Sequence, residues 1–160
     1  MHMQQLCNNN IAYLSYVWLM QTTIVWQKCL IVDSSTKKIL VLQRSDYKKD
    51  WGTWDLVWWT AEFGENIADA IKREAMEETW IILDIVRPRD LHSRMIGEDR
   101  WFVFNLRVCE DWHFASDTIV LSSEHTEWKR IDRDTFVTLP LRETVKHVQW
   151  PIKQFIETIS

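Results

Sequence analysis

Glycine is the residue that this chain most lacks. Only three of its 160 residues are glycine, whereas a globular chain of this length usually holds about eleven. The sequence contains no glycine–serine linker, and no internal repeat or low-complexity tract divides it. We therefore expect one domain over residues 1–160, with residues 1–21 as an N-terminal extension and residues 22–160 as its core.

Cysteine, excess positive charge and long apolar runs are also scarce, and each absence excludes a class of protein. The three cysteines, Cys7, Cys29 and Cys109, form no C-x-x-C pair, which argues against zinc and favours reduced thiols in a cytoplasmic protein. The net charge of −4 provides no basic surface for long nucleic acid, although a cation can still bring in a small anionic ligand. Residues 11–26 are too short and too mixed for a membrane span.

The order of the hydrophobic patterns predicts a layered domain of strands and helices. Asn66 is a suitable N-cap for a helix over residues 67–79, in which apolar side chains recur at helical spacing. Residues 132–137 predict one helical turn, and residues 141–159 predict an amphipathic helix that Pro151 kinks or restarts. Strands or short apolar runs are expected at residues 22–32, 38–44, 54–58, 81–86, 91–95, 100–109 and 128–131. Strands around two helices indicate an α+β or α/β fold with a mixed sheet.

Three glutamates share one side of the central helix. Glu74, Glu77 and Glu78 are spaced i, i+3 and i+4, so their carboxylates project together. The helix gains no stability from them, because like charges at this spacing cost roughly 0.2–0.5 kcal/mol per pair. Glu77 and Glu78 also fall in the last turn, where the helix dipole disfavours negative charge. Clustered oxygen ligands suit Mg²⁺ or Mn²⁺ shared with a phosphate substrate; the alternative is a solvated acidic helix face.

Residues 59–81 resemble the Nudix box, G-x5-E-x7-R-E-U-x-E-E-x-G-U, where U is a bulky aliphatic residue. Ala75 takes the first aliphatic position, where it is smaller than usual, and Ile81 takes the last. The five charged positions are filled at matching spacing by Glu65, Arg73, Glu74, Glu77 and Glu78. The flanking strand order also fits, so the resemblance covers about residues 22–158. It implies an α/β/α layered Nudix fold, with a mixed sheet between helices.

Tryptophan replaces both glycines of the box. Trp59 stands at the first glycine and Trp80 at the last, while Trp58 fills a place that is commonly glycine in the family. Residue 80 is expected to be the left-handed residue after the helix, where a side chain strains the backbone by about 1–2 kcal/mol. The chain holds 11 Trp, which fits the hypothesis of an active enzyme in which glycines were exchanged for tryptophan. The alternative is a natural member that lost activity.

The resemblance implies hydrolysis of a diphosphate linkage in a nucleoside diphosphate joined to another group. It implies that the backbone carbonyl of Trp59 and the carboxylates of Glu74, Glu77 and Glu78 bind Mg²⁺, with Mn²⁺ as an alternative. It also implies that an acid activates water, and the candidate catalytic residues are Glu74, Glu78 and Glu124.

Two arginines and several acids outside the trio are further candidates. Arg73 lies i, i+4 from Glu77, so it either orients that carboxylate, which we favour, or contacts substrate. Arg44 ends a strand before a loop from which the family often contacts phosphate; the alternative is a surface ion pair. Glu65 is expected to supply an outer ligand or a hydrogen bond.

Residues 122–128 resemble the later loop from which family members often supply another carboxylate. Glu124 is the first candidate for a base or additional ligand, ahead of Glu127 and Glu98, and a solvated loop acid is the alternative for each. For His125 a solvated position is favoured over an assisting role.

The leading interpretation is a Mg²⁺-dependent pyrophosphohydrolase. The family's ADP-ribose and diadenosine-polyphosphate types tend to carry a proline or a tyrosine that residues 96–103 lack, which favours a nucleoside triphosphate or a nucleotide sugar. The alternative is a non-catalytic Nudix-fold nucleotide-binding or regulatory module, which Trp58, Trp59 and Trp80 favour. The resemblance also implies a tendency to form homodimers, although no interface follows from the sequence.

Overall fold

The structure is a computed structural model, and it describes residues 22–33, 35–59, 64–84, 86–96, 100–112 and 119–159. Its elements confirm most of the expected strands and helices. In chain order they are β1 (Thr22–Asp33), β2 (Lys38–Arg44), β3 (Trp54–Asp55), β4 (Val57–Trp59), α2 (Ile67–Thr79), β5 (Arg87–Ile96), β6 (Arg100–Trp112), β7 (His125–Ile131), α3 (Arg133–Thr138), α4 (Glu143–Lys146) and α5 (Gln149–Ile159).

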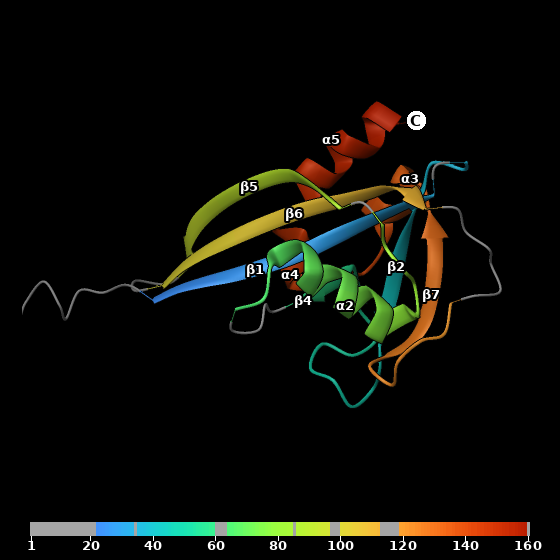
Figure 1. Cartoon of the computed structure of the whole chain (residues 1–160), viewed down its shortest axis with the longest axis horizontal. Helices are drawn as coiled ribbons and strands as arrows, with labels where there is room; N and C mark the ends of the chain where they lie inside the picture. The colour runs from blue at the N-terminus through green and yellow to red at the C-terminus, as the bar shows by residue number, and fades with distance from the viewer. Residues whose placement is uncertain are drawn as a thin grey trace, which may run out of the picture.

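The strands form one mixed sheet, as predicted (Figure 1). Its main order is β3-β2-β1-β6-β5, while β4 pairs with β1 and β7 pairs with β2. The β1–β6 pair is parallel, and the other pairs are antiparallel. Between β1 and β2 the chain turns tightly, because the backbone amide of Lys37 donates to the carbonyl of Asp33 at 2.8 Å. Strand β1 lies at the centre of the sheet, where it pairs with β2, β4 and β6.

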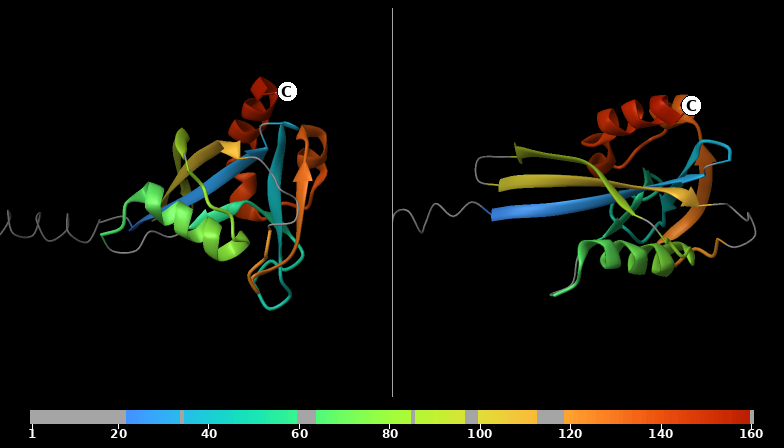
Figure 2. Two further views of the ribbon diagram at one scale, coloured as in Figure 1. Left: turned by 45° about the vertical axis from the view of Figure 1, so that its right-hand side comes forward. Right: turned by 45° about the horizontal axis from the view of Figure 1, so that its top comes forward.

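Helices cover the sheet on opposite faces, with α2 on one side and α5 on the other (Figure 2). Strand β1 alternates between the two layers, as a strand with both faces buried must. Leu30 and Val32 belong to the hydrophobic core that contains α5 residues, whereas Cys29 and Ile31 belong to the core beneath α2. Cys29 is buried, as is Cys109. The α/β/α layering expected from the resemblance is thus confirmed.

Helix α2 has the ends that its sequence predicts. The side chain of Asn66 accepts a hydrogen bond from the backbone amide of Ala68 at 2.8 Å, which caps the first turn. Ala70, Ile71 and Ala75 are buried against the sheet, so the other side of the helix is left to carry charge. Trp80 ends the helix in the left-handed conformation, with φ 59° and ψ 20°.

Two expectations need correction. Residues 81–86 do not begin a strand: residues 81–84 lie in no ladder, and β5 starts only at Arg87. Ile81 and Leu83 are nonetheless buried, so alternate burial in a loop that crosses the core imitates the period of a strand. Strand β7 also begins earlier than expected, at His125.

The C-terminal helix is interrupted rather than continuous. It consists of α4 and α5, and its apolar residues Val145, Val148 and Ile152 are all buried as the pattern predicts. Pro151 lies in the first turn of α5, where its missing N–H costs nothing. The helix therefore restarts, as one of the two expected outcomes has it, but at Gln149, two residues before the proline.

Candidate functional site

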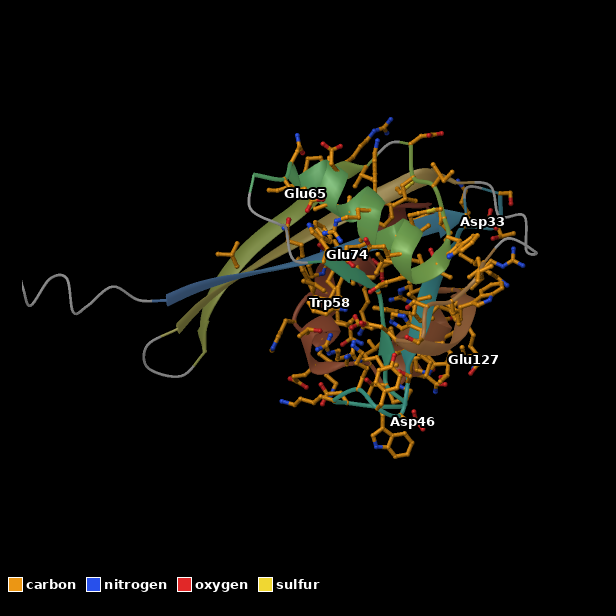
Figure 3. The ribbon with its side chains drawn as sticks, turned by 60° about the horizontal axis from the view of Figure 1, so that its bottom comes forward. Asp33, Asp46, Trp58, Glu65, Glu74 and Glu127 are labelled. Carbon is orange, nitrogen blue, oxygen red and sulfur yellow. The ribbon has the colours of Figure 1, made fainter. Side chains whose placement is uncertain are left out.

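A cavity of about 360 Å³ opens between α2, β4 and the segment before β7. Glutamates supply most of its charge, and it is lined by Trp58, Trp59, Glu74, Glu77, Glu78, Ser122, Ser123 and Glu124. Figure 3 shows Glu74 on α2 and Trp58 below it, and both belong to this lining. The fold therefore brings together Glu74, Glu77, Glu78 and Glu124, the leading ligand and catalytic candidates of the sequence.

Arg73 joins three of the box carboxylates. Its Nη1 atom donates to Glu74 Oε1 at 3.0 Å and to Glu77 Oε2 at 3.1 Å. Its Nε and Nη2 atoms donate to the two oxygens of Glu65 at 3.0 and 3.2 Å, so the guanidinium and that carboxylate form a bidentate pair. This geometry favours the orienting role of Arg73 over direct contact with a substrate, and it places Glu65 in a hydrogen bond, as the sequence suggests.

Glu78 differs from its neighbours because it is buried, with 5% of its surface exposed. Its Oε2 atom has no hydrogen-bond partner among the described residues. Burial and the nearby charge of Asp55 raise the pKa of Glu78 well above its usual value. Burial also raises the pKa of Glu74, against the attraction of Arg73. The positive groups around Glu74 and Glu78 therefore do not fully compensate the charged forms of these two carboxyls.

The donor set suits a hard divalent cation, but the ligands are not gathered around one point. In the described ranges no group of three or more His, Cys, Asp or Glu residues is arranged so that it could hold a metal ion. Two of the proposed ligands, Glu74 and Glu77, form ion pairs with Arg73 instead. The unpartnered oxygen of buried Glu78 and the all-oxygen character of the set fit Mg²⁺, provided that these side chains turn towards it.

Glu124 is held in the cavity from two directions. The Nζ atom of Lys48 contacts Glu124 Oε1 at 2.7 Å, and the carbonyl of Glu124 accepts from the backbone amide of Ser45 at 2.9 Å. The segment before Glu124 is fixed to α2, because the backbone amide of Ser122 donates to the carbonyl of Glu78 at 3.0 Å. Tertiary structure therefore brings Glu124, which is remote in sequence, to the box glutamates.

A second ionic cluster, centred on Asp55, lies behind Trp58. Asp55 is fully buried and hydrogen bonds to Lys28 Nζ and to Arg142 Nη1, the latter at 3.0 Å. Arg44 Nη1 lies 4.0 Å from the same carboxylate. Burial alone would raise the pKa of Asp55, but Lys28 and Arg142 outweigh it and lower that pKa below its usual value. The indole of Trp58 lies 5.5 Å from Lys28 Nζ and 5.3 Å from the Arg142 guanidinium.

Sequence patterns do not predict the Asp55 cluster. The available signal was a lysine and an aspartate inside runs that are otherwise apolar, since a buried charge needs a partner. Nothing in the sequence pairs Lys28 with Asp55, and Arg142 comes from a distant segment.

Two candidates are buried where a surface position was considered. Arg44 is 5% exposed and donates through Nε to the carbonyl of Lys49 at 3.1 Å, so it forms no surface ion pair and does not line the cavity. His125 is 5% exposed rather than solvated, and burial lowers its pKa to about 4. Both side chains are near Asp55: Arg44 Nη1 lies 4.0 Å from its carboxylate, and the charge of Asp55 opposes the lowering of the His125 pKa.

The two weaker acidic candidates, Glu127 and Glu98, are not part of the cavity lining as the structure describes it. Glu127 does not line the cavity; its carboxylate lies 3.2 Å from Lys129 Nζ on the surface. Glu98 lies outside the described residues. Among the described residues, the carboxylate candidates that line the cavity are therefore Glu74, Glu77, Glu78 and Glu124.

The three tryptophans differ in their surroundings. Trp59 is 1% exposed and packs in the core beneath α2, so its indole adds little surface to the cavity. Trp58 is partly exposed and faces the cavity. Trp80 is 61% exposed, so its cost lies in its left-handed backbone rather than in crowding.

The fold and the site together define an α/β/α layered domain that carries a glutamate-lined cavity beside helix α2. The family model described as NUDIX domain matches residues 27–152, and the chain belongs to the Nudix family. This matched region lies inside the core that the sequence predicts for residues 22–160.

Known proteins agree with this family assignment. Nudix hydrolase 7 of Arabidopsis thaliana is 39% identical over 64 residues, which cover 39% of this chain and 23% of that protein. The match therefore spans less than a quarter of the length of that relative.

No helix in the described parts of the chain is long and apolar enough to cross a membrane.

Solved structures share the fold at low sequence identity. The MutT protein from Methanosarcina mazei Go1 superposes with a TM-score of 0.64 at 20% identity, over 88% of this chain and 94% of that one. The E. coli ORF135 protein gives 0.68 at 20% identity, over 84% and 91%. The NUDIX domain of Shewanella oneidensis NrtR, solved with ADP ribose, gives 0.66 at 12% identity, over 86% and 90%.

Proposed function

We propose that this Nudix domain is a cytoplasmic hydrolase that uses Mg²⁺ to cleave a diphosphate linkage in a nucleoside triphosphate or nucleotide sugar. One observation carries the proposal: four glutamates line a single cavity, and one of them is buried with an unpartnered oxygen. Such an arrangement costs stability unless a cation compensates it. The names of the relatives support hydrolysis, and the NrtR domain, solved with ADP ribose, supports a nucleotide-type ligand.

The residues divide the work by position. Glu74, Glu77 and Glu78, with the backbone carbonyl of Trp59, would hold Mg²⁺ or Mn²⁺, which supplies positive charge for the diphosphate and acidifies water. Glu124 would accept the proton of the attacking water, with Glu74 and Glu78 as the other acids of the reaction. Arg73 hydrogen bonds to Glu74 and Glu77 and would orient them on α2 until the cation draws their carboxylates to itself. Arg44 remains a proposed phosphate contact, which requires it to turn from its buried position.

The test is a panel of nucleoside triphosphates and nucleotide sugars with Mg²⁺, followed by release of phosphate, pyrophosphate and nucleoside monophosphate. Glu77→Gln and Glu78→Gln should each lower turnover about 100-fold or more, because each removes a proposed ligand. Glu157→Gln, an exposed acid on α5, is the matched control and should keep full activity. Full turnover in both cavity variants would refute the proposed site.

The tryptophans need separate variants because their surroundings differ. Trp58→Gly enlarges the cavity and should raise turnover if the indole obstructs substrate. Trp80→Gly should stabilise the fold by about 1–2 kcal/mol, since glycine adopts a left-handed conformation without strain. Trp59→Gly empties a core position and should cost about 3–5 kcal/mol, so its activity must be read below its own melting temperature. Equal turnover in Trp58→Gly and the parent would refute obstruction.

A non-catalytic nucleotide-binding or regulatory module is the second candidate. The hydrogen bonds of Arg73 to Glu74 and Glu77 favour it, because they hold two proposed ligands away from a common centre. Trp58 in the cavity favours it as well. Calorimetry with ADP-ribose and nucleoside triphosphates separates the two: binding without turnover in the parent and in Trp58→Gly supports the module. A homodimer is a further proposal, which sedimentation would test.

A further inference from the structure

Two basic side chains hold carboxylates that line the cavity, one on each side of it. Arg73 holds Glu74 and Glu77 on α2, and Lys48 holds Glu124 on the segment before β7. Arg73 belongs to the Nudix box, whereas Lys48 comes from the loop between β2 and β3. The two contacts have the same form, a charge-assisted hydrogen bond of about 3 Å.

The loop that carries Lys48 is fixed by its own backbone. The amide of Gly52 donates to the carbonyl of Arg44 at 3.0 Å, which closes the loop at its base. The amide of Lys48 donates to the carbonyl of Ser45 at 3.2 Å, and the amide of Ser45 donates to the carbonyl of Glu124 at 2.9 Å. A short chain of backbone bonds therefore sets the distance between Lys48 and Glu124.

The contact is poorly explained as a stabiliser of the fold. The side chains of Lys48 and Glu124 are 30% and 38% exposed, and such pairs contribute about 0–1 kcal/mol. Its electrostatic setting is more informative. Glu124 shares its cavity with Glu74, Glu77 and Glu78, whose negative charges repel it towards solvent. Lys48 provides an opposing attraction on a fixed loop.

We infer that Lys48 is a positioning residue that keeps the Glu124 carboxylate beside the box glutamates. The inference rests on the proposed function for its effect on rate, but the position of Glu124 is independent of activity. Lys48 acts through Glu124 and makes no contact with the reacting atoms. Removal of its charge releases Glu124 to the surface, and the cavity loses its fourth acid.

A double-mutant cycle tests the kinetic part. Lys48→Met, which keeps the length of the side chain without its charge, should lower kcat about 10- to 100-fold with little change in KM or melting temperature. Lys48→Arg should restore most of the rate. In a Glu124→Gln background Lys48→Met should cause no further loss. An equal loss in both backgrounds would overturn the inference, because Lys48 would then act on substrate directly.

A crystal structure of Lys48→Met tests the positional part without any substrate. The Glu124 carboxylate should leave the cavity in Lys48→Met and stay in Lys48→Arg. A Glu124 that keeps its place in Lys48→Met overturns the inference. Failure of the proposed function shows itself differently, as absence of Mg²⁺-dependent turnover by the parent chain across the whole nucleotide panel.

Discussion

The two ionic clusters of this fold are built on opposite plans. Around Arg73, one cation holds three carboxylates at the edge of the cavity, and its Glu77 member is 57% exposed. Around Asp55, one carboxylate faces Lys28, Arg142 and Arg44 behind Trp58, and none of the four is more than 16% exposed. The first cluster keeps a surplus of negative charge in reach of solvent. The second pairs its charges inside the protein, where an unpaired ion is costly.

We therefore expect the Arg73 cluster to serve the proposed site and the Asp55 cluster to stabilise the fold. Solvent screens the Arg73 cluster, so its loss should barely change the free energy of unfolding but should disorder the proposed ligands. The Asp55 cluster joins β1, β3 and the segment before α4, so its loss should weaken the fold itself. Substitution of Arg73 and of Asp55, the central residues of the two clusters, tests this difference.

Removal of the buried centre should have the largest effect on stability. Asp55→Ala leaves Lys28 and Arg142 buried without their carboxylate, and it should lower the free energy of unfolding by about 3–5 kcal/mol. Urea denaturation followed by circular dichroism measures this loss. Asp134→Ala, which removes an exposed acid on α3, is the control and should change stability by less than about 0.5 kcal/mol. A similar small change in Asp55→Ala would contradict the structural role of the cluster.

Removal of the exposed centre should have the opposite profile. Arg73→Met frees Glu65, Glu74 and Glu77, and turnover should fall about 10- to 100-fold because the ligands lose their orientation. The free energy of unfolding should change by no more than about 1 kcal/mol. Nucleotide turnover and urea denaturation on the same preparation give both values. A loss of stability as large as that of Asp55→Ala would erase the distinction between the clusters.

Acidification should change the stability contributions of Asp55 and Glu74 in opposite directions. We expect this effect to be the smallest of the three tests. The pKa of Asp55 is lowered on folding because Lys28 and Arg142 outweigh burial, so its stabilisation is complete above about pH 4 and is lost as the pH falls further. The pKa of Glu74 is raised, chiefly by burial, so its contribution becomes more favourable as the pH falls towards the unfolded value of about 4.

Urea denaturation between pH 3 and pH 7 separates these two contributions. The stability difference between the parent and Asp55→Asn should shrink below about pH 4. Glu74→Gln should gain on the parent as the pH rises from 4 towards 7. Parallel curves for both variants would show that neither carboxyl has a pKa shifted by folding.

Much of the fold could be predicted from local patterns. The helix over residues 67–79 and its Asn66 cap follow from spacing and capping chemistry, and both are confirmed. The position of Trp80 in the left-handed region follows from the motif. The false strand at residues 81–86 shows the limit of this method, because burial with period two occurs in loops as well as in strands.

The site could be predicted only where it is local. Glu74, Glu77 and Glu78 gather because one helix carries them, and Arg73 meets them at i+1 and i+4. The Asp55 cluster draws its members from four separate segments, so only sheet pairing and the C-terminal crossing reveal it. His125 was expected in solvent for the same reason: the sequence does not show that β7 begins there and turns the ring inward.

The attachment of residues 119–124 to α2 has a consequence for the evolution of this chain. The amides of Val120 and Ser122 donate to the last carbonyls of the helix, at Thr79 and Glu78, so main-chain hydrogen bonds align the backbones of these two sides of the cavity, whatever holds their side chains. Replacement of side chains leaves these backbone hydrogen bonds in place. Side-chain exchanges along residues 119–122 can therefore accumulate while the backbone of Glu124 keeps its alignment with the helix.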